Sequence, residues 1–145
     1  MRKIVQLLVL WAGLAGLAFG PSAATAAVTA AQAKQVQLLV RAQLDAFASD
    51  DATRAFSYAA ANIQQMFGTP DQFLEMVRAS YPVVYRPASV TFLTPKPDGK
   101  TVVQPVHMTD GQGGTWLAVY RLEQQKDKSW RIAGCVLVAG SGQSI

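Results

Sequence analysis

The fold is decided by residues 101–138, which read TVVQPVHMTDGQGGTWLAVYRLEQQKDKSWRIAGCVLV. Three runs rich in β-branched and aromatic residues lie in this stretch, at positions 102–108, 115–122 and 130–138. Such runs are typical of β-strands, and short connections like 109–114 and 124–128 join antiparallel neighbours. We therefore predict an antiparallel meander. Pro105 cannot donate a backbone hydrogen bond, so an edge position or a bulge is expected there.

Strict alternation along each strand sorts the side chains onto two faces. In the strand after residue 114, one face carries Trp116, Ala118, Tyr120 and Leu122. In the last strand, alternation groups Arg131, Ala133, Cys135 and Leu137 opposite Trp130, Ile132, Gly134, Val136 and Val138. In the strand before these two, His107 shares a face with Val103 and Pro105. The register between strands decides which set faces the rest of the domain.

Upstream of this meander the apolar period is helical. Residues 30–48 carry apolar side chains at spacings of three and four, namely Val36, Leu39, Val40, Leu44 and Phe47, which indicates an amphipathic helix. Shorter helices are expected over 52–60, after possible caps at Asp50 and Asp51, over 62–67, and from Thr69-Pro70 to about Ser80.

After Tyr81-Pro82 no helical pattern recurs, and whether that peptide bond is cis is left open. Val90 and Phe92 indicate a first strand, and Pro97 to Lys100 indicates a turn. Helices first and a meander afterwards predict an α+β domain, with the helices packed on one face of a curved antiparallel sheet.

The first residues have the features of a secretory signal peptide. Arg2 and Lys3 precede an apolar run from Ile4 to Phe19, and Ala24-Thr25-Ala26 offers a cleavage site, with Ala27 as the alternative last residue. An uncleaved membrane anchor is the other interpretation of the run. We predict a signal peptide over 1–26, one domain over 27–139, a flexible tail over 140–145, and a periplasmic or secreted protein without a stable membrane anchor.

Composition excludes several classes of function. The chain has 145 residues, with 13 Lys and Arg, 9 Asp and Glu, one His and one Cys. Residues 1–26 hold two of the basic side chains and no acid, so eleven basic side chains would remain against nine acidic ones. Scattered charges with this balance do not favour nucleic-acid binding. A lone His and a lone Cys do not favour a metal site, and we predict no cofactor.

Several segments together resemble the bacterial family called domain of unknown function 4864. The most specific are Tyr81-Pro82-Val83-Val84-Tyr85-Arg86-Pro87 and Trp130-Arg131-Ile132-Ala133-Gly134-Cys135, and Phe67-Gly68-Thr69-Pro70 adds to them. The resemblance covers about residues 33 to 138. It implies a nuclear-transport-factor-2-like fold, in which helices and a bent sheet form a cone that often encloses a pocket. It implies no activity, because such a fold serves many functions.

The first functional hypothesis is a non-catalytic module that binds a small apolar or weakly anionic ligand inside this cone. The expected lining residues are Tyr81, Tyr85, Arg86, Trp116, Tyr120, Arg131 and Cys135, with Arg86 as an anion contact and Arg131 on the same face as Cys135. The second is a protein-interaction module that forms a homodimer through an exposed sheet face, its cone filled by its own side chains. The third is an enzyme that uses Cys135 or His107; the acids fall at caps, turns and exposed helix faces, so no catalytic residue is assigned.

Overall fold

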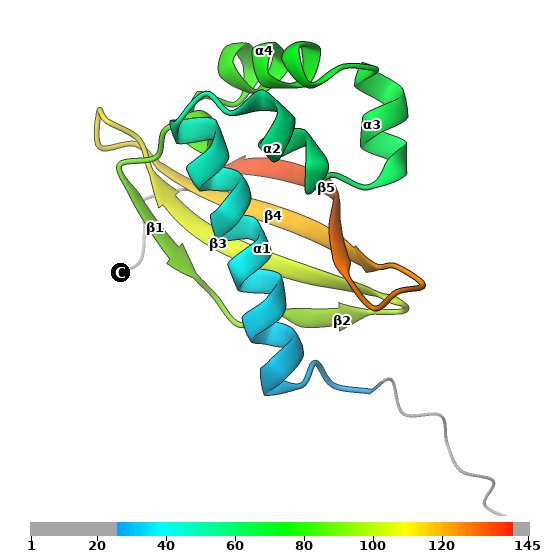
Figure 1. The fold of residues 1–145 in the computed structure, drawn as a ribbon. Helices are drawn as coiled ribbons and strands as arrows, with labels where there is room; N and C mark the ends of the chain where they lie inside the picture. Colours follow the sequence, from blue (N-terminus) through cyan, green and yellow to red (C-terminus); the bar gives the residue numbers. More distant parts are fainter. Residues whose placement is uncertain (1–25, 141–145) are drawn as a thin grey trace, which may run out of the picture.

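The structure, a computed structural model, describes residues 26–140, so the predictions for residues 1–25 and 141–145 lie outside it. In this part of the chain five helices are followed by five strands (Figure 1). The helices are α1 (Ala30–Ala48), α2 (Ala52–Ser57), α3 (Ala61–Phe67), α4 (Pro70–Ser80) and α5 (Pro82–Tyr85). The strands are β1 (Ser89–Phe92), β2 (Lys96–Asp98), β3 (Thr101–Thr109), β4 (Thr115–Gln124) and β5 (Trp130–Ala139). The predicted α+β class is confirmed.

The long helix α1 has the predicted bounds. It begins at Ala30 because Thr29 and Gln32 cap its first turn reciprocally. The Thr29 hydroxyl accepts from the Gln32 backbone N–H, and the Gln32 side chain accepts from the Thr29 N–H. Its buried stripe includes Val36, Val40 and Leu44. The helix itself lies across the sheet (Figure 1). The predicted amphipathic helix is therefore confirmed.

The chain after α1 departs from the sequence prediction in two places. The helix predicted over 52–60 ends at Ser57, because Tyr58 to Ala60 pair instead with the last strand: Ile132 N–H donates to the Tyr58 carbonyl and Ala60 N–H donates to the Ile132 carbonyl. A short helix, α5, follows Tyr81, where none was predicted; Pro82 occupies its first position, where its missing N–H costs nothing. The Tyr81–Pro82 bond is trans.

The sheet is antiparallel, with strand order β1-β3-β4-β5 and β2 paired beside β1 on the same side of β3. Residues 97 and 98, predicted as part of a turn over 97–100, thus belong to a short strand. Pro105 lies in a strand that has neighbours on both sides, and the bulge is elsewhere, so the expectation for Pro105 was wrong. Its carbonyl accepts from the Leu93 N–H at the break between β1 and β2. The missing N–H of proline is tolerated there because, within residues 26–140, no strand pairs with Pro105 on that side.

A bulge in the β4–β5 ladder changes which side chains face the helices. Leu122 pairs with Ile132 and Arg121 pairs with Gly134, so Ala133 is the extra residue. The last strand bends along its length (Figure 1). Because of the extra residue, the alternation of side chains between the two faces is reversed on the two sides of the bulge. Consequently Trp130 and Ile132 face the helices together with Cys135 and Leu137, which strict alternation had placed on opposite faces.

The core lies between the helices and this face of the sheet. Four phenylalanines meet there: the ring of Phe73 lies 5.7 Å from Phe47, 5.6 Å from Phe56 and 5.6 Å from Phe67, measured between centroids. Each of these tilted pairs has a favourable aromatic geometry. Among the described residues, no helix is both long enough and apolar enough to cross a membrane.

Candidate functional site

A pocket of about 220 Å³, called the cavity below, lies between the helices and the end of the sheet and is partly open to the surface beside Met66. Its wall comes from α1, α3, α4, α5, β4 and β5, and includes Phe47, Ile63, Phe73, Val77 and Ile132. No Asp, Glu, Lys, Arg or His belongs to this wall. Most of the surface is aliphatic or aromatic, so the cavity suits apolar rather than charged groups.

Four polar side chains contribute to the wall: Gln43, Tyr81, Tyr120 and Cys135. The Gln43 amide is committed to the fold, because its Nε2 donates to the Ala55 carbonyl at 3.1 Å. Gln43 lies three residues after Val40 and four before Phe47, on the apolar stripe of α1. That spacing is the signal that sequence reasoning overlooked at this position.

Tyr120 and Cys135 lie opposite each other on β4 and β5. The Tyr120 side chain is 1% exposed, and its hydroxyl is buried without a hydrogen-bond partner among the described residues. Burial raises the pKa of Tyr120 well above its ordinary value, and burial also raises the pKa of the Cys135 thiol to about 12. Both groups are therefore neutral at physiological pH.

A larger hollow of about 660 Å³ adjoins the cavity and shares Tyr81 and Cys135 with it. Trp116 lines this hollow, and its indole N–H donates to Asp110 Oδ2 at 3.0 Å. Backbone N–H groups of the β3–β4 hairpin, including that of Gly114, donate to the other oxygen of the same carboxylate. These bonds, that from Trp116 first, lower the pKa of Asp110. The carboxylate thus has a structural role in the turn.

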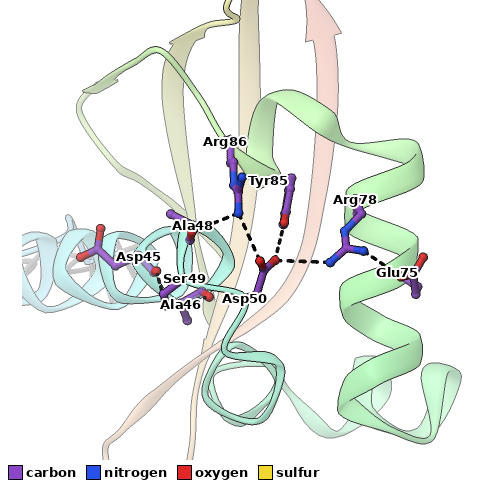
Figure 2. Close-up of polar contacts among 9 residues, drawn as sticks. All are labelled: Asp45, Ala46, Ala48, Ser49, Asp50, Glu75, Arg78, Tyr85 and Arg86. Atoms are coloured by element: carbon purple, nitrogen blue, oxygen red, sulfur yellow. Dashed lines mark hydrogen bonds and ion pairs between the residues drawn. The ribbon is translucent and has the colours of Figure 1, made fainter.

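Beside the hollow, Asp50 is held by three side chains from α4 and the α5 segment (Figure 2). Arg78 Nη2 lies 3.3 Å from Oδ1, Arg86 Nη2 lies 3.2 Å from Oδ2, and the Tyr85 hydroxyl donates to Oδ1. Both guanidinium groups also lie near the Tyr85 ring, at 5.3 and 4.7 Å from its centroid. The bond from Tyr85, followed by the arginine charges, lowers the pKa of Asp50.

This cluster ties the α1–α2 turn to α4 and α5. Asp50 and Asp51 were both expected to cap the second helix, but only Asp51 does, by accepting from the Arg54 N–H. The Arg86 guanidinium, expected as an anion contact, already pairs with Asp50 and with the Ala48 carbonyl. Sequence reasoning did not anticipate the cluster, because the three partners of Asp50 lie 28 to 36 residues after it along the chain.

The residues expected at the site fall into three groups. Tyr81, Tyr120 and Cys135 line the cavity, whereas Trp116 and Arg86 line the adjoining hollow. Tyr85 belongs to the Asp50 cluster. Arg131 lines none of these cavities, and the bulge places it on the face opposite Cys135, so the expected pairing of the two on one face was wrong.

His107 is exposed on the outer face of β3, away from the cavity. Within residues 26–140, no cluster of three or more His, Cys, Asp or Glu side chains is arranged to hold a metal ion. The described part of the chain is therefore an α+β domain with a pocket whose wall holds no charged residue.

The sequence assigns this domain to a family. The chain belongs to the family described as Domain of unknown function (DUF4864), whose family model matches residues 29–145. No curated protein and no solved structure matches the chain. The resemblance deduced from the Tyr81–Pro87 and Trp130–Cys135 segments is thereby confirmed at the level of the family.

Proposed function

We propose that this protein binds a small, uncharged and largely apolar molecule in the cavity, without catalysing a reaction. The observation that carries this proposal is a pocket of about 220 Å³, partly open to the surface, with no charged residue in its wall. Small-molecule sites are typically concave and mostly apolar, with a few polar groups. An apolar cavity of about 150 Å³ in another protein takes up benzene. The volume here therefore suits one ring or a short hydrocarbon chain.

The wall argues for a neutral ligand over the weakly anionic one that the sequence also allowed. A carboxylate placed among apolar side chains without a partner loses its hydration and is strongly disfavoured. The two arginines of the Asp50 cluster, Arg78 and Arg86, are not part of this wall, and both already pair with the Asp50 carboxylate. The ligand is therefore expected to carry no formal charge where it is enclosed.

Toluene and benzoate make a sharp test, because they have similar shape and differ in charge. Toluene is expected to raise the unfolding temperature and to shift the NMR signals of wall residues, while benzoate at the same concentration does neither. Ile63→Phe fills the cavity from α3 and is expected to abolish the toluene response. Gln65→Phe, on the same helix but exposed and outside the wall, is the matched control and keeps the response. Equal toluene binding by the two variants would refute this site.

The enzyme alternative gains no support from the geometry. A thiol whose pKa is raised to about 12 is protonated at neutral pH, and the thiolate is the nucleophilic form. His107 lies on the other side of the sheet from the cavity. The second hypothesis combined a homodimer through an exposed sheet face with a cone filled by its own side chains; its self-association is compatible with a ligand-binding pocket, whereas its filled cone is not.

We also propose that the domain is a nuclear-transport-factor-2-like cone and that it is exported by a cleavable signal peptide. In support of the first, the helices lie on one face of a sheet whose last strand bends (Figure 1). In support of the second, the charged start, apolar run and small residues of 1–26 fit a secretory signal. The mass of the protein purified from the envelope of a bacterial host tests the export: residues 27–145 are expected, and a full-length mass refutes cleavage.

A further inference from the structure

The two edges of the sheet differ in how they are protected. One edge consists of β1 and β2, which are short, interrupted at residues 93–95, and carry Pro95, Lys96 and Pro97. Short strands, prolines and lysines at an edge all discourage pairing with another chain. The other edge is β5, a strand of 10 residues whose final part, residues 134–139, reads Gly-Cys-Val-Leu-Val-Ala. That part has neither charge nor proline.

The first half of the β5 edge is covered from within the molecule. On the side away from β4, the Ile132 backbone is hydrogen-bonded to Tyr58 and Ala60. The Asn62 side chain donates to the Ala133 carbonyl at 3.0 Å. No described residue makes an equivalent contact to the backbone of the second half. The hollow of about 660 Å³ borders this half, since Cys135 and Leu137 contribute to its lining.

The ladder determines which backbone groups of this half point outward. Gly140 N–H donates to the Thr115 carbonyl, so Gly140 points toward β4. In an antiparallel ladder successive residues alternate between the two sides. Cys135, Leu137 and Ala139 therefore direct their N–H and C=O groups away from β4, at the free edge. Between them, Val136 and Val138 are 63% and 50% exposed on the outer face.

We propose that this half of β5 pairs with the same strand of a second copy of the chain, antiparallel about a two-fold axis at Leu137. Cys135 of one copy then lies opposite Ala139 of the other, and each such pair exchanges two backbone hydrogen bonds. Val136 of each copy meets Val138 of the other on the outer face. The occupant is a second copy because the pairing is self-complementary: an uncharged strand meets itself without like-charge repulsion.

Ala139→Pro tests this pairing by removing a single hydrogen-bond donor, the backbone N–H of residue 139. The substitution removes an outward N–H and leaves the bonds to β4 in place, so the monomer is expected to fold. Sedimentation velocity over micromolar to millimolar concentrations should show a dimer for the unaltered protein. Because one donor is lost on each copy, the dissociation constant of the variant should rise by about tenfold or more. Val138→Lys, an exposed substitution that adds like charges across the axis, should weaken the dimer as well.

His107→Lys is the control, because His107 is exposed on the outer face of β3, two strands away from the β5 edge. It should leave the dimer intact. Hydrogen exchange provides a second measurement: the amides of Cys135, Leu137 and Ala139 should gain protection as the dimer forms. A protein that stays monomeric at millimolar concentration overturns the proposal. So does a dimer that His107→Lys dissociates and Ala139→Pro does not, since the interface would then be the sheet face. Neither result affects the ligand-binding proposal, which the toluene test decides.

Discussion

Replacing Phe73 by leucine should destabilise the protein far more than the same change at Phe67. Phe73 is the shared partner of three tilted ring pairs, with centroids 5.6 to 5.7 Å apart, whereas Phe67 takes part in one of them. Each such pair contributes about 1 kcal/mol beyond the area that it buries. Phe73→Leu should therefore lower the free energy of unfolding by about 3 kcal/mol, and Phe67→Leu by about 1 kcal/mol.

Equilibrium urea unfolding, followed by tryptophan fluorescence, measures both losses by linear extrapolation. The double variant adds a direct value for the pair: its coupling energy should be about 1 kcal/mol, because the two rings are in contact. Equal losses from the two single substitutions would refute the reasoning, since the number of ring partners would then have no bearing on stability. A loss below about 1 kcal/mol for Phe73→Leu would refute it as well.

Three further predictions concern polar and turn residues. Asp50→Asn should lower the urea midpoint at neutral pH. The pKa of Asp50 is lowered in the fold, so its contribution to stability is present above the unfolded pKa of about 3.9 and is lost as the pH falls through the folded pKa. The difference in urea midpoint between variant and parent should therefore vanish in acid. Gly114→Ala should cost about 1 to 2 kcal/mol of unfolding free energy, because its Cβ would lie 2.4 Å from Asp110 Oδ2, whereas Gly111→Ala meets nothing within 4 Å and should cost little. Cys135 should react slowly with iodoacetamide at pH 8 in the native protein and rapidly in urea; equal rates would contradict the raised thiol pKa.

The sequence predicted the elements whose signal is long and periodic. The apolar stripe of α1 and the strands β3, β4 and β5 are clear over many residues, so tertiary contacts did little to change them. The wrong predictions concern short segments whose conformation depends on residues far away in the sequence. Tyr58 to Ala60 leave the helix to pair with Ile132, and Lys96 to Asp98 become a strand only because Val102 and Val103 lie beside them.

Within the strands, the sequence places a side chain at the cavity wall only where strict alternation is kept. Tyr120 and Cys135 were expected at the wall and lie there. Arg131 was expected beside them, but the extra residue at Ala133 reverses the parity of β5 between the two positions. The Asp50 cluster carries no local signal at all, since an acid after a helix is as typical of a cap as of a long-range ion pair.

The bridge between Ala59 and Ile132 affects the order in which the chain can fold. It joins the link between α2 and α3 to a strand that begins only at Trp130, so the helical half contains backbone groups whose partners are synthesised after the other described strands. Until β5 is in place, the Tyr58 carbonyl and the Ala60 N–H must rely on water, and the cavity lacks the wall that Ile132 and Cys135 supply. A chain shortened before residue 130 would therefore lose more than an edge strand. The link between α2 and α3 would lose its backbone partner, and the cavity would be open on the side that Ile132 and Cys135 close.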